Sequence, residues 1–317
     1  MNIVVLDGYT LNPGDLNWQG FEAFGDFICF DRTPANQLLE RAIDAQVLLT
    51  NKTVLDAATI AALPKLKYIG VLATGTNVVD IGAAKAHGVT VTNVPGYGPD
   101  AVAQMVFAHI LHHTQAVAAH HHAVSDGQWS QGDDFCFTLS PLQSLKGKTL
   151  GLIGYGDIGR QVATIARAFQ MQVLVNSHRP KTDLPEGVTW CELDLLYKQA
   201  DIISLHCPLT SDTDQMINAV SLARMKPNVL LINTARGGLI DEQALADALN
   251  HGVIAAAGVD VLSTEPPEAN NPLLRAKNIS ISPHNAWATL EARANLMAIA
   301  LDNLKAFIKG DAVNRIC

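Results

Sequence analysis

The glycine-rich turn at residues 154–159, with the sequence GYGDIG, constrains the fold of this chain more than any other segment. It follows directly on the apolar run Leu150–Ile153, which is typical of a buried strand. After the turn, apolar side chains recur at helical spacing, at Ile158, Val162, Ile165, Ala166 and Phe169. A strand, a glycine turn and a helix in this order are the start of a unit that binds a dinucleotide.

Each glycine of the turn has a mechanical reason in such a unit. Gly154 permits the tight turn out of the strand, Gly156 lets the backbone approach a pyrophosphate, and Gly159 allows close helix packing. Asp157 and Ile158 open the helix, whose N-terminal N–H groups would face the phosphates. We therefore predict that these five residues bind the cofactor. The alternative is a glycine turn with a packing role alone.

The choice of dinucleotide depends on the residues after the second strand, Val173–Val175. NAD-binding units carry a carboxylate there that hydrogen-bonds the ribose hydroxyls, whereas this chain has Ser177. Without the carboxylate, nothing repels a 2′-phosphate, and Arg179 can pair with it. The residues accept NAD or NADP as cofactor and favour NADP slightly. The alternative is that Arg179 is a solvated charge and Ser177 contacts an NAD ribose.

Short runs rich in Val, Ile and Leu alternate with helical segments along the whole chain. Most of these runs are apolar at successive positions, which suits a parallel sheet covered by helices on both faces. The expected strands are 3–6, 47–49, 68–71, 89–92, 150–153, 173–175, 202–205, 229–232, 256–259 and 279–281. The fold class is therefore α/β, with two Rossmann-like, doubly wound parallel-sheet domains.

At 317 residues, the chain is long enough for two domains. The segment 93–100 contains two prolines and two glycines, which predicts a hinge, with Asp100 capping the next helix. Helical spacing from Trp287 to about Ile308 predicts a last helix that returns to the first domain. We predict a substrate domain at 1–99, completed by 288–317, and a dinucleotide-binding domain at 100–287.

Charge and cysteine content exclude several classes of protein. The net charge of −8 argues against a nucleic-acid or anionic-membrane partner. The five cysteines are scattered and form no CxxC pair, as in a reduced cytosolic protein. Met1 leads directly into a strand-like run, and no apolar run reaches membrane-spanning length. We expect a cytoplasmic protein that acts on a small molecule.

Three side chains of complementary chemistry, Arg236, Glu265 and His284, each follow a separate apolar run. Ligands bind outside the carboxyl ends of the strands in open α/β sheets, so the three can share one site. A guanidinium matches a planar carboxylate, and a histidine can supply a proton near neutrality, with a carboxylate to orient its ring. Beside a dinucleotide, this set suits hydride transfer to a small 2-keto acid. Taken singly, each residue can also be an ion-pair partner, a loop acid or a cap.

These motifs resemble those of the D-isomer-specific 2-hydroxyacid dehydrogenase family over essentially the whole chain. The matching segments are 154–159, 206–210, 233–238, 258–261 leading to Glu265-Pro266, and Pro283-His284. Residues 6–15 and 284–288 are similar to the branch of hydroxypyruvate reductases, also called glycerate dehydrogenases. One departure is Ser177, because the NAD-dependent members carry an aspartate at that position.

The resemblance implies a role for each candidate residue. Arg236 would hold the substrate's carboxylate and carbonyl, His284 would donate the proton, and Glu265 would hydrogen-bond His284. The nicotinamide side of the cofactor would be lined by Cys207, Thr234, Ala235 and Asp260. Thr74 and Gly75 would lie in the loop whose N–H groups meet the substrate carboxylate; the alternative is an ordinary turn.

Six of the eleven histidines lie between positions 109 and 122. His109 and His113 have the spacing of a metal-binding helix face, but no acidic residue accompanies them, so we predict no metal site. Instead, we expect the segment Ala101–Val124 to be an interface helix with solvated histidines. The resemblance implies that this helix takes part in a homodimer.

The activity that these features favour is NAD(P)H-dependent reduction of hydroxypyruvate to D-glycerate, with glyoxylate reduced to glycolate as well. One alternative is a dehydrogenase for another D-2-hydroxy acid, such as lactate, phenyllactate or a branched-chain acid. Another is a dinucleotide-sensing, corepressor-like binding protein of the same fold. Formate oxidation is disfavoured, because Glu265 stands where similar formate dehydrogenases carry a glutamine.

Overall fold

The computed structural model describes residues 1–317, which divide into two compact units. Unit 1 comprises Met1–Gly98 and Trp287–Cys317, and unit 2 comprises Pro99–Ala286. Each unit contains one sheet in which every neighbouring pair of strands is parallel. The prediction of an α/β fold with two parallel sheets is confirmed.

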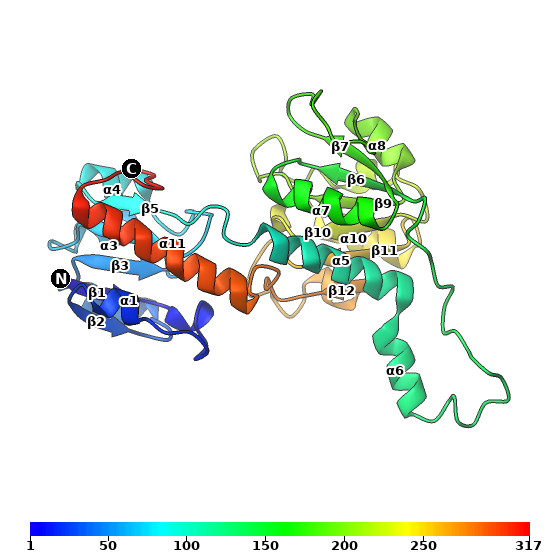
Figure 1. Ribbon diagram of the computed structural model, residues 1–317, viewed down its shortest axis with the longest axis horizontal. Coiled ribbons are helices and arrows are strands. Elements are labelled where there is room, and N and C mark those ends of the chain that lie inside the picture. The colour runs from blue at the N-terminus through cyan, green and yellow to red at the C-terminus, as the bar shows by residue number, and fades with distance from the viewer. The chain divides into compact units, whose positions relative to one another are not determined.

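The sheet of unit 1 has the strand order β2-β1-β3-β4-β5 (Figure 1). Its strands are β1 (Asn2–Val5), β2 (Asp26–Cys29), β3 (Val47–Thr50), β4 (Tyr68–Val71) and β5 (Thr90–Thr92). The central strands β3 and β4 are buried at every residue, because helices cover both faces. The sequence pattern does not predict the edge strand β2, whose residues alternate between exposed and half-buried.

The last helix of the chain belongs to unit 1. The helices of this unit are α1 (Gln19–Glu22), α2 (Leu38–Ala42), α3 (Ala57–Ala61), α4 (Ile81–Ala86) and α11 (Leu290–Lys309). Helix α11 packs on β4, and the Phe307 ring lies 4.8 Å from the Tyr68 ring, so the helix returns to the first sheet as predicted. The predicted start at Trp287 is wrong. The helix begins at Leu290, because Thr289 caps it by accepting a hydrogen bond from the Ala292 N–H.

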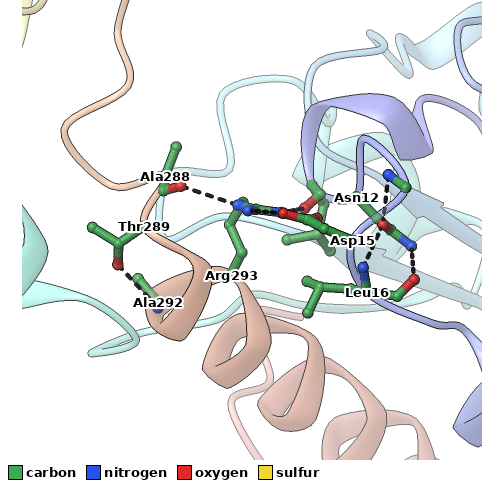
Figure 2. A network of polar contacts seen from close by, with 9 residues as sticks. Asn12, Asp15, Leu16, Ala288, Thr289, Ala292 and Arg293 are labelled. Atoms are coloured by element: carbon green, nitrogen blue, oxygen red, sulfur yellow. Dashed lines mark hydrogen bonds and ion pairs between the residues drawn. The ribbon is translucent and has the colours of Figure 1, made fainter.

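An arginine near the start of α11 ties this helix to the loop after β1 (Figure 2). The two terminal nitrogens of Arg293 donate to the two carboxylate oxygens of Asp15, at 2.7 and 2.6 Å. One of them also donates to the Leu11 carbonyl. Within the loop, the Asn12 side chain exchanges hydrogen bonds with the Leu16 backbone. The segment 11–16 is therefore fixed to the helix.

The sheet of unit 2 has the strand order β12-β11-β10-β9-β6-β7-β8. Its strands are β6 (Thr149–Ile153), β7 (Gln172–Asn176), β8 (Val188–Trp190), β9 (Ile202–Leu205), β10 (Leu230–Asn233), β11 (Ala256–Val259) and β12 (Ile279–Ile281). The first strand, β6, lies between β7 and β9, so the chain changes direction across the sheet there. Ligands of open α/β sheets bind at such a switch point. The sequence pattern does not predict the short edge strand β8.

Helices cover both faces of this sheet. The helices of this unit are α5 (Pro99–Gln115), α6 (Val117–Ser125), α7 (Asp157–Ala168), α8 (Leu193–Gln199), α9 (Ala219–Leu222) and α10 (Glu242–Asn250), of which all but α6 pack on the sheet. Helices α5 and α7 share one core cluster with Leu150 and Leu152, while α8, α9 and α10 share another with Ile153. The prediction that Asp100 caps α5 is wrong, because the helix already begins at Pro99, one residue before Asp100. Its carboxylate lies in the first turn, where the helix dipole favours it.

The predicted helix over Ala101–Val124 is divided in two. Ala116 adopts a left-handed conformation, with φ of 48°, between the end of α5 and the start of α6. No residue of α6 is buried, and Figure 1 shows α6 and the following loop extending away from the sheet of unit 2. None of the helices of the chain combines the length and the apolar character needed to cross a bilayer.

Candidate active site

The loops after β10, β11 and β12 run side by side at the carboxyl edge of the second sheet. The Asp260 N–H donates to the Asn233 carbonyl at 2.9 Å, and the Ser282 N–H donates to the Val259 carbonyl at 2.9 Å. The His284 N–H then donates to the Asp260 carbonyl at 2.7 Å. The pairing of the strands therefore continues beyond their ends, and it brings together the three loops that carry the predicted arginine, glutamate and histidine.

Glu265 and His284 form a hydrogen-bonded pair in these loops. Nδ1 of His284 lies 2.5 Å from Oε2 of Glu265. Oε1 of the same carboxylate accepts a hydrogen bond from the Leu262 N–H at 3.0 Å. The exposed fractions of the two side chains are 29% for His284 and 34% for Glu265. The pair is therefore oriented by the protein, yet it remains accessible to a ligand.

The backbone that carries His284 is held in an unusual conformation by Asp260. The φ angle of His284 is 52°, in the left-handed region that non-glycine residues rarely adopt. The buried Asp260 carboxylate accepts the N–H groups of Asn285 and Ala286, each at 3.0 Å. Burial raises the pKa of Asp260, while hydrogen bonds from Ser282 and from these two N–H groups oppose the rise. The Asp260 side chain thus fixes the turn in which His284 lies.

Arg236 lies on the turn that leaves β10. The buried side chain of Asn233 accepts the Ala235 N–H and donates to the Arg236 carbonyl, which shapes the turn. A Cβ added to Gly237 would lie 1.9 Å from the carbonyl carbon of Leu262, so the turn packs directly on the loop of Glu265. The Arg236 guanidinium is exposed, donates to the Ala235 carbonyl and forms no ion pair. Its charge is available to an anion.

In the glycine turn between β6 and α7, close packing requires two of the three glycines and does not require the third. A Cβ at Gly154 would lie 2.4 Å from the His206 backbone, and one at Gly159 would lie 2.6 Å from the Gly154 carbonyl oxygen. Gly156, in contrast, has open space around its Cβ position. It precedes α7, whose first turn, with Asp157 and Ile158, receives no side-chain cap. Open space beside uncapped N–H groups fits a phosphate group.

The remaining predicted cofactor residues follow β7, β9 and β10. Ser177 comes directly after β7, and its hydroxyl donates to the carbonyl of Arg179, whose own side chain is exposed and forms no ion pair. Cys207 is half-buried after β9, and burial raises the pKa of its thiol. Thr234 is buried after β10, and its Oγ1 has no hydrogen-bond partner. An unpartnered buried hydroxyl beside Ala235 fits a polar group of a ligand.

Thr74 and Gly75 lie in unit 1, in the loop after β4. The Thr74 hydroxyl donates to the Val94 carbonyl at 2.8 Å, and the Asn93 side chain donates to the Thr74 carbonyl at 2.7 Å. The sequence pattern does not indicate a further organiser of this unit, the buried Asp7, which accepts the N–H groups of residues 51–53. Asp7 thereby shapes the loop after the neighbouring strand β3.

The prediction of solvated histidines is wrong for His109 and His113. His109 is 5% exposed, and both rings hydrogen-bond residues of β11 and β12 or of the loop after β12. Packing of α5 on these strands, which sequence spacing does not reveal, is the reason. The structure contains no group of three or more His, Cys, Asp or Glu side chains arranged to hold a metal ion.

The fold and this site define a dinucleotide-dependent oxidoreductase, and comparison with known proteins makes the class specific. Residues 107–286 match the model of the D-isomer specific 2-hydroxyacid dehydrogenase, NAD binding domain. The chain is 46% identical to a hydroxypyruvate reductase of Blautia hydrogenotrophica, over 99% of each chain. It is 40% identical to a glyoxylate reductase of Thermococcus litoralis, over 88% of this chain and 85% of the relative. The chain belongs to the D-isomer specific 2-hydroxyacid dehydrogenase family.

A solved structure extends the likeness over the full length. An acyclic imino acid reductase, Bsp5, in complex with NADPH and D-Arg superposes with a TM-score of 0.87 at 30% identity, over 100% of each chain. The family model and this structure together support NAD(P) as the cofactor.

Proposed function

We propose that the protein reduces hydroxypyruvate to D-glycerate with NAD(P)H, and glyoxylate to glycolate as a second substrate. The observation that carries the proposal is the pair of His284 and Glu265, beside an exposed, unpaired Arg236 at the same edge of the sheet. The reductases of hydroxypyruvate and glyoxylate named above support the choice of substrates.

Arg236 binds the substrate through its carboxylate in this proposal. A guanidinium donates two parallel hydrogen bonds to a planar carboxylate, which orients the keto acid as well as attracting it. The exposed guanidinium has no carboxylate partner within the protein, so binding the substrate breaks no ion pair. We assign a second contact to the loop of Thr74 and Gly75 in unit 1, through backbone N–H groups.

His284 supplies the proton. A protonated imidazole donates through both nitrogens, and Nδ1 is directed at Glu265, so we assign Nε2 to the carbonyl oxygen of the substrate. The bound cofactor supplies the hydride that reaches the carbonyl carbon. As the negative charge develops on oxygen, His284 transfers its Nε2 proton to that oxygen and becomes neutral. One keto acid, one NAD(P)H and one proton thus give one hydroxy acid and one NAD(P)⁺.

The cofactor site combines the glycine turn with the ends of three strands. Gly154, Gly156, Asp157, Ile158 and Gly159 would hold the pyrophosphate, with the open space at Gly156 as the supporting observation. The nicotinamide half would lie against Cys207, Thr234, Ala235 and Asp260, where Thr234 offers an unpartnered hydroxyl.

A preference for NADP is part of the proposal. Ser177 brings no negative charge to the ribose site, and Arg179 is exposed and unpaired. The test compares kcat/KM for NADH and NADPH in the wild type, in Arg179→Ala and in Ser177→Asp. Arg179→Ala should weaken NADPH alone, and Ser177→Asp should favour NADH. Equal loss with both cofactors would contradict the role of Arg179.

We further propose that the chain forms a homodimer through the segment 117–142 and that it is cytoplasmic. This segment exposes large apolar side chains: Val117, Val124, Trp129, Phe135, Leu139 and Leu142. Phe135 is 91% exposed, which is costly unless another surface covers it. Sedimentation velocity of the wild type and of Phe135→Ser tests the dimer, because the variant should shift towards monomer. The cytoplasmic location is supported by five unpaired cysteines.

The decisive experiment for the activity mixes the purified protein with hydroxypyruvate and follows the loss of NADH or NADPH absorbance. Rapid oxidation that is abolished in His284→Ala supports the proposal. Oxidation only with lactate-, phenyllactate- or branched-chain-type keto acids would move the assignment to another substrate of the same family. No turnover with any keto acid, together with nucleotide-dependent binding of a protein partner, would support a sensing role instead.

A further inference from the structure

His109 is a buried histidine with a site prepared for it on the sheet of unit 2. It projects from α5 onto β11, where Gly258 makes room for it. A Cβ added to Gly258 would lie 2.7 Å from the Cβ of His109. A larger residue at 258 would therefore push the histidine off the sheet.

The ring of His109 links two serines. Nδ1 lies 2.7 Å from Oγ of Ser280, and Nε2 lies 3.0 Å from Oγ of Ser282. Ser282 in turn donates to Oδ1 of Asp260 at 2.5 Å. On the other side, Nε2 of His113 lies 3.0 Å from Oγ of Ser280 and 2.9 Å from the Ala257 carbonyl oxygen. Five side chains thus form one continuous chain of hydrogen bonds.

The chemistry of the two ends determines the direction of every bond. A carboxylate only accepts, so the Ser282 hydroxyl donates its single proton to Asp260 and must accept a hydrogen bond from the Nε2–H of His109. A carbonyl also only accepts, so His113 carries its proton on Nε2. Ser280 accepts from this group and donates to Nδ1 of His109. All the hydrogen bonds therefore point from His113 towards Asp260, and each strengthens the next.

The protonation state of both histidines agrees with this assignment. Burial, together with the nearby His112, lowers the pKa of His109 to about 4. Burial likewise lowers the pKa of His113 to about 4. The titratable groups next to the two rings are His112, whose ring lies 4.9 Å from that of His113, and Asp260, which Ser282 joins to His109. Near neutral pH each buried ring carries one proton, as the chain of hydrogen bonds requires.

Asp260, at the accepting end of this chain of hydrogen bonds, also holds the turn that carries His284. The Asp260 carboxylate accepts the N–H groups of Asn285 and Ala286, and the Asp260 carbonyl accepts the N–H of His284. The left-handed backbone of His284 needs such support, because non-glycine residues rarely adopt this conformation.

We propose that His109 is a positioning residue for His284, which acts through Ser282 on the Asp260 carboxylate and so on the turn at 284–286. The inference rests on the proposed function of His284 as proton donor. His109 touches neither substrate nor cofactor in this proposal, and its effect is on the placement of another residue.

Four variants separate this role from packing. His109→Phe keeps the ring volume and removes both polar atoms. His109→Gln offers an amide N–H to Ser282 and an amide oxygen to Ser280, so it keeps both roles. Ser282→Ala leaves His109 in place and breaks the link to Asp260. His251→Gln, at the exposed end of α10 and in contact with neither buried ring, is the matched control.

The readouts are kcat and KM for hydroxypyruvate, the pH dependence of kcat, and the ¹⁵N spectrum of the histidine rings. Misplacement of a reacting group by about 1 Å can cost about 10²-fold in rate. We expect His109→Phe and Ser282→Ala to lower kcat by about 10- to 10²-fold with little change in KM, and to move the ring signals of His284. His109→Gln should recover most of the kcat, and the control should match the wild type.

Unchanged kcat, pH dependence and His284 signals in folded His109→Phe would overturn the proposal. If His109→Phe does not fold, the same unchanged readouts in Ser282→Ala overturn it. If the wild type shows no turnover, the proposed function fails separately. The ring signals then decide alone: an Nε2–H tautomer of His109 and a His284 signal that moves in Ser282→Ala support the positioning role, and their absence refutes it.

Discussion

Glu265 joins His284 to the backbone of its own loop: Nδ1 of the histidine lies 2.5 Å from Oε2, while Oε1 accepts the Leu262 N–H. Both oxygens of the carboxylate are engaged, so neither the glutamate nor the ring can rotate without the loss of a hydrogen bond. The negative charge of Glu265 also lies directly against the ring that donates the proton in the proposed reaction. Orientation and charge are thus two separate contributions of one side chain.

Glu265→Gln removes the charge and weakens the orientation. Glutamine keeps the shape of the side chain and can still accept the ring N–H through its amide oxygen, but it carries no charge, and its amide nitrogen then faces the Leu262 N–H as a second donor. We expect kcat for hydroxypyruvate reduction to fall by about 10²-fold, at the lower end of the roughly 10²–10⁴-fold that a general acid contributes, with KM within a few-fold. Steady-state kinetics measure the effect, and Glu268→Gln, exposed on the same loop, serves as control. An unchanged kcat would remove Glu265 from the mechanism.

Two glycines should respond in opposite ways to alanine. Gly237→Ala places a Cβ 1.9 Å from the Leu262 carbonyl carbon, and overpacking of this kind destabilises by about 1–3 kcal/mol or more. Gly156→Ala meets no atom within 4 Å and keeps an allowed φ of −84°. Thermal unfolding should show a lower Tm for the first variant and a wild-type Tm for the second. NADH and NADPH titrations should show weaker binding by Gly156→Ala. Wild-type cofactor affinity in that variant would argue against a phosphate at the turn.

The sequence predicts those features whose reasons are local. The glycine turn, the buried strands and the candidate residues at strand ends all follow from runs of a few residues. The partners of His109 cannot be read in this way, because Ser280 and Ser282 are 171 and 173 positions away. The sequence pattern does not predict the edge strands β2 and β8 for another reason. They are short and only partly buried, so they lack the apolar run of a central strand. The break between α5 and α6 at Ala116 is not predicted either, because no glycine or proline lies there.

The ion pair of Arg293 and Asp15 should make stability depend on pH in the acid range. The hydrogen bond from Arg293 holds the pKa of Asp15 below its usual value of 3.8. Because the unfolded chain binds this proton more readily, the contribution is present above about pH 4 and is lost as the pH falls below it. Asp15→Asn should lower the Tm at neutral pH, and the difference from wild type should shrink below about pH 4. Asp302→Asn, on the exposed face of α11, should leave the Tm unchanged at every pH.

The buried histidines should make stability fall at a higher pH than the ion pair does. Burial lowers the pKa of His109 and of His113 from 6.5 to about 4. Between these values the unfolded chain takes up protons that the folded chain excludes, so the free energy of unfolding decreases as the pH falls from about 6.5 towards 4. His113→Gln removes one of the two groups, and the decline of Tm between about pH 6.5 and 4.5 should become shallower. The exposed His251→Gln, which lies away from both rings, should decline as the wild type does. Equal slopes in all three proteins would show that His113 takes up its proton in the folded state as well, and the hydrogen-bond direction assigned to His113 would then be wrong.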